Sequence, residues 1–331
     1  MAIVNWGILS TAKIAQKELI PAFLRSTNAK VTAIATGSGI ERAQQVAQKF
    51  SIEKAYDNNN ALLEDSSIDA VYIPLPNHLH KKWVIEAAKK RKHILCEKPA
   101  ALTANEVIEM KEACEQNGVI FMEGFMYQFH PQHERVRQII DSGEIGEISY
   151  MRASFSFLLA NKENTIKMND QGGGCIYDIG CYPIHSIRNI LREEPTHIQT
   201  QAKYDETYKV DTDVYTYMEF ASGRRAVFDA SFNQMRRSEY EVVGTEGRVI
   251  VPRAYRPDWN GGDGLVIVEK SGISRTETLN ADQYRNQIEV ISAAILDGKI
   301  KSELSFDNTF ANMHVIDACF KSMKSGKLVQ L

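Results

Sequence analysis

Three side chains that can bind a hydroxyl group and exchange its proton lie close together in the second half of the chain. Asp178, Tyr182 and His185 have the spacing i, i+4 and i+7, which places an acid, a phenol and an imidazole on one face of a helix. Such groups act as general acids and bases. Gly172-Gly173-Gly174 precedes them and lets the backbone approach a ligand closely. Taken alone, the segment is equally consistent with a capping turn around a partly buried tyrosine.

A second candidate is Lys98, which follows a strand-like run at 93–96 and precedes Pro99. The rigid proline holds this lysine at the carboxyl end of the strand. Taken alone, it would be interpreted as a surface lysine in a turn. The segment Pro76-Asn77-His78-Leu79-His80 lies between another strand and a helix, where open α/β sheets bind ligands. No metal is predicted, because His78, His80 and Cys96 lack the spacings of zinc sites.

The first strand–helix turn has the small residues that a dinucleotide pyrophosphate requires. The backbone N–H groups and the helix start could approach the phosphates here. Two of the three glycines of the usual fingerprint are replaced, by Ser10 and Ala12, so an ordinary tight turn explains the segment equally well. The candidate cofactor contacts are Gly7, Ser10, Thr11, Ala12, Lys13 and Ile14.

The end of the second strand indicates which nicotinamide cofactor is used. An NAD site usually has an acidic residue there for the ribose 2′-hydroxyl. This chain has Ala35-Thr36-Gly37-Ser38-Gly39, followed by Glu41 and Arg42. Ser38 and Arg42 could bind a 2′-phosphate instead, which predicts NADP(H) with NAD(H) as the weaker option. Without this context, Arg42 would be interpreted as a solvated helix residue.

Two successive patterns of elements must position these residues. Over about the first 125 residues, strand-like and helix-like segments alternate, as in a parallel sheet covered by helices. Consecutive strand-like runs then predict a mainly antiparallel sheet, and two helices follow near 283–296 and 308–323. We therefore expect an α/β protein. Its Rossmann-type parallel-sheet domain covers residues 1–123, and an α+β domain with an open, mainly antiparallel sheet covers residues 124–331.

Composition limits the partners. The 331 residues carry a formal net charge of −3, which gives no general attraction for nucleic acid or an anionic membrane. No apolar run approaches the ~20 residues that span a bilayer. The five cysteines are irregularly spaced, and the first residues do not resemble a secretory signal. These features predict a cytoplasmic protein with reduced thiols.

These segments, in this order, resemble the Gfo/Idh/MocA family of oxidoreductases over essentially the whole chain. The most specific stretch runs from Pro76-Asn77-His78-Leu79-His80 to Glu97-Lys98-Pro99. Residues 122–131 are similar to the family's strand that leads into the second domain, and residues 172–182 to its substrate helix. Many members have histidine four residues after the aspartate. Tyr182 at that position resembles the branch with dimeric dihydrodiol dehydrogenases, glucose–fructose oxidoreductase and NADP-dependent xylose dehydrogenases.

The resemblance implies a site between the two domains and roles for individual residues. Lys98 would contact both nicotinamide and substrate, Tyr182 would exchange the proton, and Asp178 would bind substrate. Lys98-Pro99 would be a cis peptide. An ordinary tyrosine has a pKa of ~10, so an ammonium group beside Tyr182 would favour the phenolate. Pro76, Asn77, His80 and Glu97 would join Lys98 in binding the cofactor, and His185 would join the substrate contacts. Gln128 replaces an arginine that some members have.

We therefore expect a dehydrogenase or reductase that interconverts a hydroxyl and a carbonyl on a sugar, inositol or related polyol. One alternative is an oxidoreductase for trans-dihydrodiols or other non-sugar carbonyls, with Tyr255 and Trp259 as an aromatic wall. Another is a non-catalytic regulator that binds a dinucleotide or sugar. A homodimer or homotetramer is expected, because apolar and aromatic residues occupy both faces of the strand at 214–220, and Val227, Phe228 and Phe232 extend them.

Overall fold

The computed structural model describes residues 2–161, 168 and 171–331. The chain divides into two compact units. Met1–Met126 and Tyr284–Phe310 form the first, and Tyr127–Gln283 and Ala311–Leu331 form the second. The sequence pattern placed every residue after 123 in the second domain. The structure instead returns the segment Tyr284–Phe310 to the first unit.

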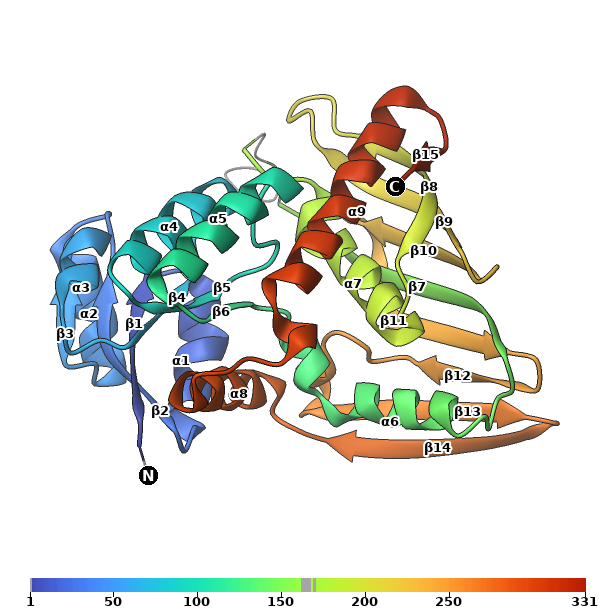
Figure 1. Cartoon of the computed structure of the whole chain (residues 1–331), viewed down its shortest axis with the longest axis horizontal. Coiled ribbons are helices and arrows are strands. Elements are labelled where there is room, and N and C mark those ends of the chain that lie inside the picture. The colour runs from blue at the N-terminus through green and yellow to red at the C-terminus, as the bar shows by residue number, and fades with distance from the viewer. Residues whose placement is uncertain (1, 162–167, 169–170) are drawn as a thin grey trace. The chain divides into compact units, whose positions relative to one another are not determined.

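The first unit is built on a six-stranded sheet in the order β3-β2-β1-β4-β5-β6 (Figure 1). Every described pair of neighbours in this sheet is parallel. This is the parallel Rossmann-type sheet that the alternating pattern predicts. The strands are β1 (Val4–Leu9), β2 (Ala29–Ala35), β3 (Lys54–Tyr56), β4 (Ala70–Ile73), β5 (His93–Cys96) and β6 (Phe121–Glu123).

Helices connect these strands, and one of them comes from the far end of the chain. Trp6 on β1 is fully buried, and its ring N–H donates to Ser292 Oγ at 3.1 Å. Ser292 lies on α8, so this helix belongs to the first unit although it follows the second sheet in sequence. The elements are η1 (Ala15–Leu19), α1 (Ile20–Arg25), α2 (Ile40–Phe50), α3 (Asn59–Glu64), η2 (Asn77–Leu79), α4 (His80–Lys89), α5 (Ala104–Asn117), α8 (Gln283–Asp297) and η7 (Ser302–Leu304).

The second unit is built on a nine-stranded sheet in the order β14-β13-β12-β11-β7-β10-β9-β8-β15. The pair β7–β10 is parallel and the other described pairs are antiparallel, which confirms the predicted mainly antiparallel sheet. The strands are β7 (Ile148–Leu158), β8 (Pro195–Tyr204), β9 (Asp211–Phe220), β10 (Arg225–Ser231), β11 (Asn233–Gly244), β12 (Gly247–Val251), β13 (Asp263–Lys270), β14 (Ile273–Asn280) and β15 (Val329–Gln330).

Helices cover one face of this second sheet (Figure 1). Alternate residues of each strand point to opposite faces, and on β10 this buries Phe228 and leaves Val227 half-buried. Phe232 is also buried, so two of the aromatic residues expected at an interface belong to the core. The remaining elements are η3 (Met126–Phe129), α6 (Pro131–Asp141), η5 (Ile176–Gly180), α7 (Cys181–Leu191), η6 (Pro257–Asn260) and α9 (Phe306–Ser325). Within the described residues, no helix is long and apolar enough to cross a membrane.

Candidate active site

The carboxyl ends of the parallel strands bring the predicted cofactor segments together at one edge of the first sheet. The segments that follow β1, β2, β4 and β5 all leave this edge, because the strands run in the same direction. The strand order reverses between β1 and β4, and ligands of open α/β sheets bind at such a reversal. The geometry of the first unit therefore fits a dinucleotide along this edge.

The turn after β1 is closed by a serine instead of a glycine. Ser10 Oγ accepts the backbone N–H of Ala12 at 3.0 Å, and the first helix begins directly afterwards. Thr11 is buried, Ala12 and Ile14 are half-buried, and Lys13 is exposed. Gly7 lies earlier, inside β1, where an added β-carbon would stand 2.5 Å from a side-chain carbon of Leu62. Its small size therefore serves the packing of α3 against the sheet.

The loop after β2 presents polar groups that suit a phosphate. Ser38 and Arg42 are both exposed, and Arg42 lies in the first turn of α2. Gly39 caps this helix with a positive φ of 103°, a conformation that glycine adopts readily. A hydroxyl, a guanidinium and a helix N-terminus together fit the 2′-phosphate of NADP.

Lys98 is held by contacts to its neighbours on both sides. The N–H of Glu97 donates to Ile73 O at 3.1 Å, and Tyr72 donates from its hydroxyl to Glu97 Oε1 at 2.6 Å. The N–H of Ala100 donates to Glu123 Oε1 at 2.8 Å. Lys98-Pro99 is a cis peptide, as the resemblance implies, and Lys98 is half-buried. Glu123, which the structure buries, was not predicted as a site residue. The sequence feature that could have identified it is an acidic residue at the end of an apolar strand.

His80 joins the loops that follow β4 and β5. Its ring is fully buried, with Nδ1 2.9 Å from Pro99 O and Nε2 2.8 Å from Leu75 O. Burial lowers the pKa of His80 to about 4, although both carbonyl oxygens act in the opposite direction. The neutral ring therefore donates to only one of these two carbonyl oxygens at neutral pH, and its other nitrogen has no proton to donate. Because the ring is fully buried between these two carbonyl oxygens, the structure favours a bracing role over the predicted cofactor contact. Pro76 caps η2, and Asn77 begins it.

In the second unit, Asp178 lies in the π-helical turn η5, which runs directly into α7. The N–H of Cys181 donates to Ile176 O, five residues back. Pro183 has no N–H, and in an ordinary helix its ring would clash with the carbonyl four residues earlier. A wider turn before the proline relieves this conflict. The spacing argument assumed one continuous α-helix, so Asp178 precedes the helix that carries Tyr182 and His185.

Tyr182 lies within a cluster of aromatic rings. It is 5% exposed, and its ring centroid is 5.2 Å from Phe155, 5.5 Å from Tyr255 and 5.9 Å from Tyr127. The Tyr255 hydroxyl pairs with Ser186 Oγ at 2.9 Å. We call Tyr127, Phe155, Tyr182 and Tyr255 the aromatic cluster. Phe155 was not predicted, although the alternation of β7 points it toward the core.

His185 is buried one helical turn after Tyr182. Its Nδ1 lies 2.7 Å from the Tyr127 hydroxyl, and its side chain is almost completely inaccessible. Burial lowers the pKa of His185 well below its ordinary value, so the ring is neutral. The structure places this ring in the core against Tyr127, which does not favour the predicted direct contact with substrate.

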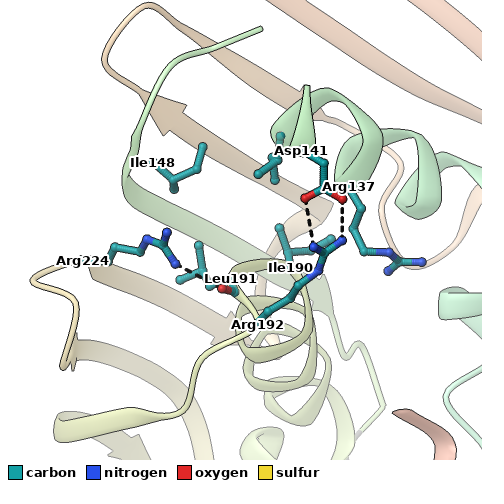
Figure 2. A pocket seen from close by; sticks show the side chains of 8 residues that line it. Arg137, Asp141, Ile148, Ile190, Leu191, Arg192 and Arg224 are labelled. Atoms are coloured by element: carbon teal, nitrogen blue, oxygen red, sulfur yellow. Dashed lines mark hydrogen bonds and ion pairs between the residues drawn. The ribbon is translucent and has the colours of Figure 1, made fainter. Parts of the chain in front are cut away.

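A cavity of about 150 Å³ lies at the opposite end of α7 (Figure 2). Two of its charged groups, Arg192 and Asp141, pair with each other. Arg192 donates to both carboxylate oxygens of Asp141 at 2.9 Å, and Arg224 donates to Leu191 O at 3.2 Å. These contacts tie α6 to α7 and cap the end of α7. We assign the cavity a structural role.

Among the described residues, no group of three histidine, cysteine or acidic side chains could hold a metal ion.

Comparisons with known proteins agree along the whole chain. Residues 4–125 match the Gfo/Idh/MocA oxidoreductase family, described as having an NAD-binding Rossmann fold, and residues 133–250 match the C-terminal domain of that family. The chain is 35% identical to a D-xylose 1-dehydrogenase (NADP(+)) of Haloferax volcanii, over 98% of this chain and 99% of the relative. It is 28% identical to a trans-1,2-dihydrobenzene-1,2-diol dehydrogenase of Xenopus laevis, over 75% of each.

A solved structure agrees with the fold. KijD10, a 3-ketoreductase from Actinomadura kijaniata in complex with NADP and TDP-benzene, superposes with a TM-score of 0.91. The sequences are 27% identical, and the match covers 97% of this chain and 98% of KijD10.

Proposed function

Because this chain belongs to the Gfo/Idh/MocA oxidoreductase family, we propose that it interconverts a hydroxyl and a carbonyl on a sugar, inositol or related polyol. The observation that carries this proposal is the pair of candidate proton-handling groups. Lys98 is fixed at the end of β5, and Tyr182 lies in the aromatic cluster on α7. The named activities of the relatives include both a sugar dehydrogenase and a sugar ketoreductase, and reversible chemistry accommodates both.

The cofactor in this proposal is NADP(H). Ser38 and Arg42 are exposed at the end of β2, where an NAD site usually has an acid. The xylose dehydrogenase is named for NADP(+), and the KijD10 complex contains NADP. NAD(H) would bind more weakly, because it offers no phosphate to the Arg42 guanidinium.

In the proposed mechanism, the bound nicotinamide supplies the hydride acceptor or donor. Tyr182 removes the proton of the substrate hydroxyl during oxidation and returns it during reduction. Lys98 donates a hydrogen bond to the substrate oxygen and orients it. Asp178 accepts a hydrogen bond from a further hydroxyl of the substrate and thereby sets its orientation. The other three rings of the aromatic cluster pack around the Tyr182 ring and limit the access of water to it.

A second candidate is the oxidation of a dihydrodiol or another non-sugar alcohol. The aromatic packing supports it, because the fully buried Tyr255 ring stacks on Phe155 at 5.2 Å and provides apolar packing behind Tyr182. Trp259 does not take part in this cluster; its ring is covered by the guanidinium groups of Arg236 and Arg256, at 4.1 and 4.5 Å. The dihydrodiol dehydrogenase relative is consistent with this candidate.

We also propose a homodimer or homotetramer in the cytoplasm. Tyr215 is 51% exposed on the outer face of the second sheet, and Tyr217 and Val227 are half-buried there. Such a face is a candidate interface. The five cysteines are free and buried, which suits a reducing compartment. Light scattering at micromolar concentration tests the assembly, and a monomeric mass would refute it.

The decisive experiment is a screen of sugars, inositols and diols with NADP and NAD in both directions. We expect turnover of a sugar or polyol with NADP. Turnover of diols alone would select the second candidate. Binding of NADP and sugar without any turnover would instead indicate a regulator.

A further inference from the structure

The segment that carries Asp178 is held by a carboxylate from another strand. Asp211 is the first residue of β9 and is only 2% exposed. Its Oδ2 accepts the N–H of Ile176 at 2.7 Å, at the start of the π-helical turn. Burial raises the pKa of Asp211, and hydrogen bonds from Ile176 and Cys175 act in the opposite direction. A negative charge at this end of a helix also interacts favourably with the helix dipole.

Gly174 makes this contact possible. It has a φ of +101°, and an added β-carbon would lie 2.2 Å from Asp211 Oδ1. Any side chain at this position would therefore displace the carboxylate. The carbonyl of Gly174 accepts the N–H of Asp178 at 3.1 Å. The same short segment thus contacts Asp211 on one side and fixes the backbone of Asp178 on the other.

The sequence around this turn provides little local rigidity. Glycine has more backbone freedom than any other residue, and three consecutive glycines, Gly172-Gly173-Gly174, lead into the turn. Cys175 caps the π-helical turn without a side-chain capping bond, and its Sγ donates instead to Ala230 O on β10 at 3.6 Å. The place of the turn in the unit therefore depends on contacts with residues distant in sequence, and the bond from the Ile176 N–H to Asp211 is the shorter of these two, at 2.7 Å against 3.6 Å.

We propose that Asp211 is a positioning residue for substrate binding. It fixes the turn Ile176–Gly180 and thereby the place of Asp178. The inference rests on the proposed role of Asp178 in binding substrate. Asp211 itself touches neither substrate nor cofactor in this scheme. Its effect passes through the backbone contacts of Ile176 and Gly174.

The test is Asp211→Asn in the full chain. The amide has the same size, but its NH₂ group replaces an acceptor where N–H donors converge. We expect the KM for the sugar or polyol found in the screen to rise about tenfold, because a charge-assisted hydrogen bond is lost. The Kd for NADPH, measured by fluorescence, should stay within about twofold. Amide hydrogen exchange over 176–180 should accelerate about tenfold, while exchange in α8 stays unchanged.

A matched control and a double mutant separate positioning from general destabilisation. Asp213 is buried two residues further along β9, but it binds Ser231 and Asn233 instead of the turn. Asp213→Asn should lower the thermal midpoint and leave KM unchanged. Asp211→Asn should add nothing to the KM of Asp178→Asn, because both act through the same contact.

The outcomes distinguish this inference from the proposed function. An unchanged KM in Asp211→Asn, or a KM effect that multiplies with that of Asp178→Asn, overturns the positioning role. An unchanged KM in Asp178→Asn overturns the proposed substrate contact, and with it the effect of Asp211 on affinity. Exchange over 176–180 still tests the anchor independently, and unchanged exchange in Asp211→Asn refutes it.

Discussion

The hydroxyl of Tyr127 lies 2.7 Å from Nδ1 of His185, and this pair is buried beside the ring of Tyr182. Burial raises the pKa of Tyr127 and lowers that of His185, so both groups are neutral. The pair can support the aromatic cluster through packing and one hydrogen bond. A neutral, buried imidazole is poorly suited to carry the proton of the reaction at neutral pH.

We therefore expect His185→Leu to lower stability more than activity. The change removes the imidazole that pairs with the buried Tyr127 hydroxyl, and the loss of such a partner costs about 1–3 kcal/mol in unfolding free energy. The value of kcat should fall only a few-fold, and the shape of its pH profile should persist. Stopped assays across pH 5–10, with thermal unfolding in parallel, provide the measurement. A loss of about 100-fold in kcat, together with the loss of one limb of the pH–rate profile, would identify His185 as the residue that transfers the proton.

Tyr182→Phe and Lys98→Ala should each lower kcat by ~10²–10⁴ while NADPH binding survives. The first change keeps the ring and its packing and removes only the hydroxyl. The second removes a positive charge from the proposed substrate contact, so it should also shift the pH–rate profile. If the two residues act as one unit, the double mutant is little worse than the weaker single mutant. Near wild-type kcat in Tyr182→Phe would exclude the proposed proton transfer.

Sequence patterns predicted the sheets better than the domain boundary. The alternating pattern gave the parallel sheet because each buried strand appears as a continuous apolar run. The return of α8 to the first unit depends on a tertiary contact, Trp6 with Ser292, which no local pattern contains. Burial of Phe228 and exposure of Tyr215 follow from strand alternation, and only the register assigns each to its face.

The candidate site shows the same division between local and tertiary information. The spacing of Tyr182 and His185 correctly predicted that they share a helix. The π-helical turn that carries Asp178 could not be predicted, because periodicity arguments assume 3.6 residues per turn. Asp211 was missed for a related reason. Its partner Ile176 is distant in sequence, so only the fold identifies this acid as the anchor of the turn.

Arg42→Ala should reduce the preference for NADP over NAD. The exposed guanidinium is the proposed partner of the 2′-phosphate, and the loss of such a pair costs about tenfold or more in affinity. KM for NADP should rise by that factor, while KM for NAD changes little. Comparing kcat/KM for both cofactors is the measurement, and Lys49→Ala, at the other end of α2, is the control. A strong NAD preference that Arg42→Ala leaves unchanged would contradict the assignment.

His80 should make stability depend on pH between about 4 and 6.5. The pKa of His80 is lowered to about 4 in the folded protein and is ~6.5 in the unfolded chain. Between these values the unfolded chain binds a proton that folded His80 does not. Its contribution is therefore complete above pH 6.5 and is lost as pH falls toward 4, by about 3 kcal/mol. Urea unfolding across this range should show a smaller decline in His80→Gln. An identical decline in both proteins would show that other groups dominate.

Gly174→Ala should reproduce the effect of removing the Asp211 contact. The new methyl group meets Asp211 Oδ1, and a φ of +101° is unfavourable for alanine. We expect about a tenfold higher KM for substrate, by the same displacement of the carboxylate. Gly118→Ala is the matched control, because Gly118 has a φ of +66° at the end of α5 and its β-carbon would meet nothing within 4 Å. That change should cost about 1 kcal/mol of stability and leave KM unaltered. A rise in KM in both variants would indicate that backbone strain, wherever it occurs, impairs the enzyme, and that the Asp211 contact has no specific role.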